Sequence, residues 1–334
     1  MIYIKPSFYN RFKCIAADCT DNCCIGWEID VDESTLYSYE QITGDFAERL
    51  RANLVKSADG STCFKLCKNE RCAFLNENNL CDIIINCGEE RLCEICREHP
   101  RFYEWFPGVT ECGLGLCCEE VCRLLLENDR MFTLEESNDG EKIELNSKED
   151  VYESDFYIFI AGLRDDFFEI LSNKVLSFEE RLVKILEKTE SFTGESCRLK
   201  NDKALVKLYL QTEPVDGVWT EYINDLNEKL DDVLKAEEAF YSSACNNFLY
   251  AKILAYMLYR HLIKGVFDKC IAERVCFCIE SLRFVMLSDM KTFYETNKLD
   301  NIDRVNNLKR WSKQIEYSEE NTDLLIYGSE ENGN

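Results

Sequence analysis

The N-terminal segment Cys14-Ile-Ala-Ala-Asp-Cys19-Thr-Asp-Asn-Cys23-Cys24 decides the fold of the first third of the chain. It begins a cysteine-rich region, because 15 of the 20 cysteines precede residue 123. Such a region can use a bound metal in place of the hydrophobic core that it lacks. We therefore expect irregular structure there, with short helices such as 117–127 and a strand at 27–31.

Three further pairs of cysteines have spacings that suit metal ligands: Cys72-x8-Cys81, Cys93-x2-Cys96 and Cys117-Cys118. Thiolates a few positions apart can converge on one ion, whereas the adjacent Cys23 and Cys24 point in different directions. The adjacent pair therefore indicates either two sites or one ligand with a second thiol beside it. Four thiolates suit a structural zinc ion as well as an iron–sulfur cluster, so the spacing does not choose the metal.

The chain has a large excess of acidic side chains. Its 334 residues include 39 Lys and Arg against 63 Asp and Glu, which gives a formal net charge of −24. A surface of this charge repels phosphates, so we expect no nucleic acid among the partners of the protein. The same negative field favours a basic partner, including a lysine-bearing protein.

The start of the sequence offers no signal-peptide core, and no apolar run in the sequence is long enough to span a membrane, which takes about 20 residues. We therefore expect a cytoplasmic protein that does not contact the membrane. Cytoplasmic thiols are normally kept reduced, so metal ligation explains 20 cysteines better than a disulfide scaffold does.

Composition divides the chain into three parts: a cysteine-rich cluster-binding region at 1–127, an acidic linker or loop at 128–153, and a helical region at 154–328 that packs on the first part. In the third part, apolar residues such as Ile160, Leu163 and Phe167 recur at helical spacing. The segments 237–264 and 268–293 indicate two neighbouring helices. The predicted fold class is mainly α, with an irregular cysteine-rich metal-binding N-terminal region followed by a helical C-terminal region.

Several segments together resemble the flagellin lysine-N-methylase family, which belongs to a broader group of zinc- or iron-chelating proteins with clustered cysteines. The segments that match are, in chain order, residues 12–27, Cys72-Ala73-Phe74-Leu75 with Leu80-Cys81, Gly88-Glu89 through Leu92, Cys96-Arg97, His99-Pro100-Arg101 and Leu114-Gly115-Leu116-Cys117-Cys118-Glu119-Glu120. Weaker likeness continues in 246–249, 259–260 and 315–321. The resemblance therefore covers almost the whole chain.

This resemblance implies transfer of a methyl group from S-adenosylmethionine to lysine side chains of flagellin, by a protein that carries a [4Fe–4S] cluster. Carried over position by position, it implies as metal ligands Cys14, Cys19, Cys23, Cys24, Cys72, Cys81, Cys96 and Cys118. The chain departs from the family pattern in seven additional cysteines before residue 123, Cys93 among them, and in Glu119, which stands where the family has a proline.

The methyl-donor site and the catalytic base have weaker signals in the sequence. Arg97 and Arg101 have side chains that can bind the carboxylate of S-adenosylmethionine through paired hydrogen bonds, although salt bridges to nearby acids explain them as well. A lysine attacks a methyl sulfonium only as the neutral amine, yet no base stands out among the acids and tyrosines. The alternative hypothesis is a protein-binding module that zinc stabilises and that has no catalytic activity.

Overall fold

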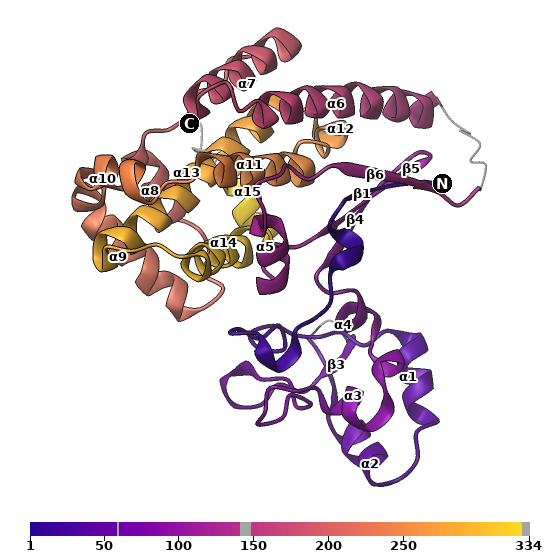
Figure 1. The fold of residues 1–334 in the computed structure, drawn as a ribbon. Helices are drawn as coiled ribbons and strands as arrows, with labels where there is room; N and C mark the ends of the chain where they lie inside the picture. Colours follow the sequence, from indigo (N-terminus) through magenta and orange to yellow (C-terminus); the bar gives the residue numbers. More distant parts are fainter. Residues whose placement is uncertain (59, 141–147, 329–334) are drawn as a thin grey trace, which may run out of the picture. The chain divides into compact units, whose positions relative to one another are not determined.

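The computed structural model describes residues 1–58, 60–140 and 148–328 (Figure 1). Within these residues it contains 15 α-helices and six β-strands, which confirms the mainly α fold class. The chain forms two compact units. The cysteine unit comprises Lys13–Phe102 with Cys118–Glu120, and the helical unit comprises Met1–Phe12, Tyr103–Cys117 and Val121–Asn334.

The cysteine unit consists of short elements around a hydrophobic core of its own. Tyr39, Leu50, Phe64 and Phe74 are almost completely buried in this core. The expectation that the region lacks such a core is therefore wrong, and so is the strand at 27–31, where Asp30 forms an isolated bridge with Cys63. The regular elements are α1 (Glu33–Glu40), α2 (Asp45–Ala52), β2 (Leu54–Lys56), β3 (Thr62–Phe64), α3 (Asp82–Cys87) and α4 (Glu94–Glu98).

One carboxylate fixes the start of two helices in the cysteine unit. Asp32 is the N-cap of α1 and accepts a hydrogen bond from the backbone N–H of Thr35 at 2.9 Å. Its second oxygen accepts one from the backbone N–H of Glu94, also at 2.9 Å, at the first residue of α4. Both contacts satisfy N–H groups that a helix leaves unpaired at its N-terminus. They hold the pKa of the Asp32 carboxyl well below its usual range, although burial opposes that shift.

A four-stranded mixed sheet, in the order β4-β5-β1-β6, lies mainly in the helical unit. β1 (Ile2–Pro6) runs parallel to β5 (Val109–Leu114) and antiparallel to β6 (Leu134–Asn138), and β4 is Arg101–Phe106. Ile4 stands opposite Glu111 on one side and Glu136 on the other. Because opposed residues share a face of a sheet, one row of side chains runs from Glu111 through Ile4 to Glu136.

Two helices form the centre of the helical unit. α11 (Asn247–His261) and α13 (Ile271–Thr296) are buried on nearly all sides, as expected for helices enclosed by neighbours. α6 (Lys148–Ser172), α7 (Phe178–Thr193), α9 (Gly217–Lys235) and α14 (Asn301–Ile315) pack around them (Figure 1). The remaining helices are α5 (Glu119–Leu126), α8 (Asp202–Tyr209), α10 (Glu237–Ser243), α12 (Gly265–Asp268) and α15 (Glu319–Tyr327).

The structure refines the elements expected from the sequence. The expected helix at 237–264 is two helices, α10 and α11, because Asn246 accepts hydrogen bonds from the N–H groups of Phe248 and Leu249 and begins a new helix. The acidic stretch at 128–153 contains β6, while its residues 141–147 lie outside the described residues. None of the described helices combines the length and the apolar character that a membrane crossing requires.

Candidate metal centre

Five cysteines gather in the core of the cysteine unit. Cys93 is fully buried and Cys72 is 6% exposed. Cys24, Cys81 and Cys96 are partly buried and pack against the same core. Four of these five belong to the ligand set that the resemblance implies, and Cys93 is an addition to it.

Backbone contacts bring distant cysteines together. The N–H of Cys72 donates to the carbonyl of Cys24 at 2.9 Å, so these two residues, 48 positions apart in the chain, are neighbours. Cys81 forms a bridge with Leu75 and is the N-cap residue of α3. Cys93 is the N-cap residue of α4, and Cys96 lies one turn further along that helix. Cys81 and Cys93 therefore lie at the N-terminal ends of two short helices.

The backbone offers hydrogen bonds to the sulfur atoms of Cys72 and Cys81. Burial raises the pKa of Cys72 to about 11, and the N–H of Phe74 opposes that shift. Burial also raises the pKa of Cys81, while the N–H groups of Ile84 and Ile83 lower it. Donors of this kind stabilise a thiolate, which is the form of cysteine that binds metals. The site thus combines a desolvated environment with donors that suit negatively charged sulfur.

The thiols also bond to each other in pairs. A hydrogen bond between Cys93 and Cys96 lowers the pKa of Cys93 and raises that of Cys96 well above its usual value. A hydrogen bond to Cys23, followed by burial, raises the pKa of Cys24 in the same way. In the described parts of the chain, no group of three or more His, Cys, Asp or Glu side chains is arranged to hold a metal ion. Two pairs of thiols, Cys93 with Cys96 and Cys23 with Cys24, are hydrogen-bonded instead.

The donor set nevertheless fits a thiolate-bound metal in its chemistry. The charges of Cys81 and Cys93 raise the pKa of Cys72, and the charge of Cys93 raises that of Cys81, which places these sulfur atoms within electrostatic reach of each other. Ligation replaces thiol protons with a cation and removes this repulsion. The thiol pairs would have to separate so that the sulfur atoms could turn toward one centre.

Of the other cysteines in the implied ligand set, Cys23 is hydrogen-bonded to Cys24, whereas Cys14, Cys19 and Cys118 lie elsewhere in the cysteine unit. Cys14 is exposed, and its sulfur accepts a hydrogen bond from the N–H of Ala16 at 3.4 Å. The thiol of Cys19 lies 3.7 Å from Oε2 of Glu119, the residue after Cys118. Glu119 thus joins the segments that carry Cys19 and Cys118, and it also accepts from the N–H of Thr20 at 3.0 Å.

Arg97 and Arg101, the predicted contacts of the methyl donor, lie near the end of α4. Nε of Arg97 is 3.6 Å from Oε1 of Glu98, and the Arg97 side chain is about half exposed. Nη1 of Arg101 donates to the backbone carbonyl of Arg97 at 3.3 Å. Their role in binding S-adenosylmethionine stays a prediction.

The ligand set that the resemblance implies does not include two residues of this centre. Cys93 lies within the Cys93-x2-Cys96 spacing, which is itself a signal typical of metal ligands. Tyr39 has no such signal. Its hydroxyl donates to the carbonyl of Arg91 at 2.9 Å, and burial, with the nearby sulfur atoms of Cys93 and Cys96, raises its pKa.

Three curated proteins are similar to this chain. Lysine-N-methylase of Salmonella typhimurium is 28% identical over 147 residues, and that of Salmonella choleraesuis is 29% identical over the same length. Each match covers 40% of this chain and 34% of the relative, so the chain spans about a third of the length of these two proteins. Flagellar biosynthetic protein FliU of Salmonella muenchen is 28% identical over 134 residues, 38% of this chain and 79% of that protein.

No family model and no solved structure matches the chain. The matches with the curated proteins confirm the resemblance predicted from the sequence, as a distant relationship.

Proposed function

Because the chain is a distant relative of the flagellin lysine-N-methylases, we propose that it transfers methyl groups from S-adenosylmethionine to lysine side chains of flagellin. We further propose that it holds a [4Fe–4S] cluster in the cysteine unit. The observation that carries the proposal is the combination of this relationship with the five cysteines gathered in one core.

Cys24, Cys72, Cys81, Cys93 and Cys96 are the residues that would hold the cluster. The N–H groups that face Cys72 and Cys81 favour the thiolate form, and the hydrophobic core around Cys93 excludes water from the sulfur atoms. When bound, a cluster supplies iron–thiolate bonds that stabilise the unit and a centre able to exchange an electron. The other four cysteines of the implied ligand set are candidates for a second metal site. They are Cys14, Cys19, Cys23 and Cys118.

The reaction itself sets a requirement on the protein. In polar methyl transfer, the lone pair of the lysine nitrogen forms the new N–C bond while the S–C bond breaks and its electron pair stays on sulfur. Under about 0.1% of an ordinary lysine is neutral at pH 7, because its pKa is near 10.4. The protein must therefore desolvate the target amine or accept its proton, and the residue that does so is not assigned.

The test is a methylation assay on protein purified without oxygen. Purified flagellin is incubated with the protein and S-adenosylmethionine that carries a labelled methyl group, and label on lysine is measured together with bound iron, sulfide and zinc. We expect label on flagellin lysines, with iron and sulfide in the preparation. Cys96→Ser should lose the metal and the activity, whereas Cys270→Ser, in α13's N-terminal loop, should keep both.

Two results would decide against the proposal. If flagellin carries no label after incubation, the protein is not a flagellin methyltransferase and the proposal fails. A colourless protein that contains zinc alone and binds flagellin without modifying it would support the zinc-stabilised binding module instead.

A further inference from the structure

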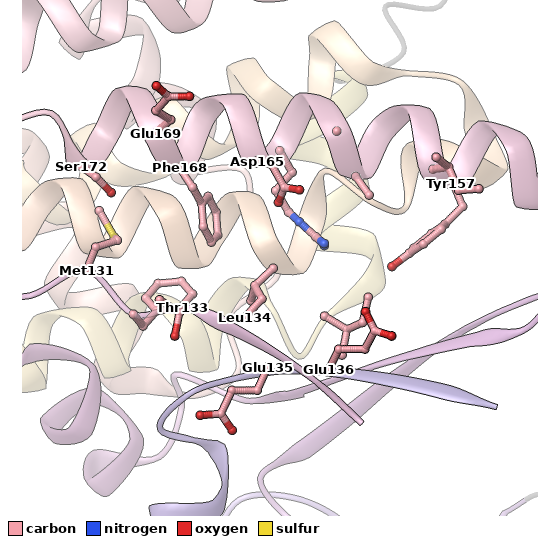
Figure 2. Close-up of a pocket in the computed structure, with 16 residues that line it drawn as sticks. Met131, Thr133, Leu134, Glu135, Glu136, Tyr157, Asp165, Phe168, Glu169 and Ser172 are labelled. Atoms are coloured by element: carbon pink, nitrogen blue, oxygen red, sulfur yellow. The ribbon is translucent and has the colours of Figure 1, made fainter. Parts of the chain in front are cut away.

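A groove of about 690 Å³ opens between β6 and α6 in the helical unit, and no cysteine is among the residues that line it (Figure 2). Its floor is apolar and includes Ile4, Leu134 and Phe132. In Figure 2, Phe168 and Tyr157 extend from α6 toward the strand, and Glu136 extends from β6 toward the helix. The two walls are therefore a helix and a strand, with ring faces and aliphatic groups between them.

Carboxylates occur on both walls of the groove. Glu136 belongs to the strand and Asp165 to the helix, and both side chains are exposed. Among the residues that line the groove, the one cation is Arg164, which is 2% exposed and pairs with Glu111 at 2.6 Å. Because that cation is already neutralised, the outer part of the groove is electrostatically negative. Its charge suits an ammonium group.

A second observation points to a ligand in the groove. Nε of Arg164 is buried and has no hydrogen-bond partner among the described residues, whereas Nη1 of the same side chain donates to Glu111. A buried donor without an acceptor is costly, and few occur in native proteins. Arg164 lines the groove, so an acceptor supplied by a ligand, such as a peptide carbonyl, would satisfy it.

The strand wall is also an edge. In the described sheet, β6 is the terminal strand and pairs with β1 on one side. The main-chain groups on its other side are those with which an added extended segment pairs. Small-molecule sites usually bury most of their ligand, whereas Glu136 and Asp165 on these walls are exposed. The open shape therefore favours a protein segment over a small ligand.

We propose that the groove between β6 and α6 binds an extended, lysine-bearing segment of the protein substrate, with a lysine stem on the apolar floor and its ammonium between Glu136 and Asp165. The identification of that segment with a methylation substrate rests on the proposed function. The binding itself does not, because it depends on the charge and shape of the groove.

Gly162 provides a variant that blocks the groove without disturbing the fold. It lines the groove within α6, and a Cβ added there would meet no atom within 4 Å. Gly162→Lys should therefore fold normally and place its own ammonium in the groove. Gly217→Lys, at the start of α9, is the matched control, because a Cβ there also has open space.

Binding is measured with a short fluorescein-labelled peptide in which threonine and lysine alternate, and with the same peptide after acetylation of every lysine. Glu136→Gln/Asp165→Asn and Gly162→Lys should each weaken binding of the unmodified peptide by about fivefold or more. Glu221→Gln/Glu228→Gln, which removes the same charge from the exposed side of α9, and Gly217→Lys should change it less than about twofold. The acetylated peptide should bind weakly to every variant.

Three outcomes would overturn this assignment. If the groove variants and the control variants lose affinity for the peptide equally, net charge alone attracts the peptide. If the acetylated peptide binds as tightly as the unmodified one, the groove does not recognise ammonium groups. Competition by S-adenosylmethionine, with loss of that competition in Gly162→Lys, would make the groove the methyl-donor site instead. If the wild-type protein binds the peptide in this groove but does not methylate flagellin, the proposed function fails while the groove assignment stands.

Discussion

Nη1 of Arg164 lies 2.7 Å from Oε1 and 2.6 Å from Oε2 of Glu111, and both side chains are almost completely buried. The contact joins α6 to β5, and the hydroxyl of Tyr157 donates to the same carboxylate at 2.7 Å. The guanidinium also stacks near the ring of Tyr259, whose centroid is 5.3 Å away. This group fixes the helix wall of the groove relative to the sheet.

Glu111→Leu should therefore destabilise the protein strongly. It leaves the charge of Arg164 buried without its counterion, and breaking a buried pair in this way costs about 3–5 kcal/mol. The double variant Glu111→Leu/Arg164→Met should recover much of that loss, because no isolated charge remains. Urea denaturation measures both. If Glu111→Leu is as stable as the wild-type protein, the ion pair between Arg164 and Glu111 does not stabilise the fold as we infer.

The second prediction concerns acid stability. Nε2 of His261 lies 2.9 Å from Oε1 of Glu316, and burial, which outweighs this contact, lowers the pKa of His261 to about 4. The charges of Arg260 and Lys264 lower it further. Between pH 6.5 and 4 the unfolded chain binds a proton at His261 that the native state does not, so stability should fall as the pH falls through this window, by about 3 kcal/mol from this group.

His261→Gln is the control for this prediction, because an amide can still donate to Glu316 and does not titrate. Other groups contribute to acid denaturation in both proteins, Glu316 with its lowered pKa among them, so the comparison is the difference between the two stability profiles. Between pH 6.5 and 4, the free energy of unfolding should depend less on pH in His261→Gln than in the wild-type protein. Identical slopes would show that His261 does not titrate as the structure indicates.

Cys197 should be the fastest-reacting thiol of the helical region. A hydrogen bond from Cys276 lowers the pKa of Cys197, whereas those of Cys245, Cys270 and Cys278 are raised, chiefly by burial. Reactivity toward iodoacetamide follows the thiolate fraction. Peptide mapping after brief alkylation at pH 7 should find Cys197 modified first, and Cys276→Ala, which removes the hydrogen-bond donor, should slow its alkylation severalfold. Faster labelling of Cys245 or Cys270 in the native protein would contradict this.

The ligand set can be tested one cysteine at a time. We expect Cys93→Ser to reduce bound metal as much as Cys96→Ser does, because both lie in the buried thiol group. Cys270→Ser is the control, since its half-buried thiol contacts the carbonyl of Asp268 at 3.4 Å in the helical unit. Metal per chain, measured after anaerobic purification, is the readout. If Cys93→Ser keeps all of its metal while Cys19→Ser and Cys118→Ser lose theirs, the metal binds instead to the segments that Glu119 joins.

Local patterns predicted the elements whose evidence is local. The helix expected at 117–127 appears as α5. The helix expected at 237–264 appears as α10 and α11, and the one expected at 268–293 appears as α13, which packs on α11. The break before α11 depends on the side chain of Asn246, whose capping role competes with a helical pattern that continues through it. The spacing of apolar residues gives no indication of such a break in the helix.

The sheet could not be predicted in the same way. β1 pairs Ile4 with Glu111 and Glu136, residues more than a hundred positions away, and nothing in a window around any of the three indicates the partner. The acidic character of β6 is typical of a loop, yet its backbone pairing decides its structure. For the metal centre, the spacings Cys72-x8-Cys81 and Cys93-x2-Cys96 predicted candidate ligands, while the burial of Cys93 and Cys72 in one core is a feature that only the fold reveals.

The most direct test of the central claim is the methylation state of flagellin in cells. Flagellin is expressed in a bacterial host with this protein, with its Cys96→Ser variant or with Cys270→Ser, and its lysine-containing peptides are mapped by mass spectrometry. We expect methylated lysines with the wild-type protein and with Cys270→Ser, and unmodified lysines with Cys96→Ser. Flagellin that is unmodified in every strain, or equally methylated with Cys96→Ser, would contradict this claim.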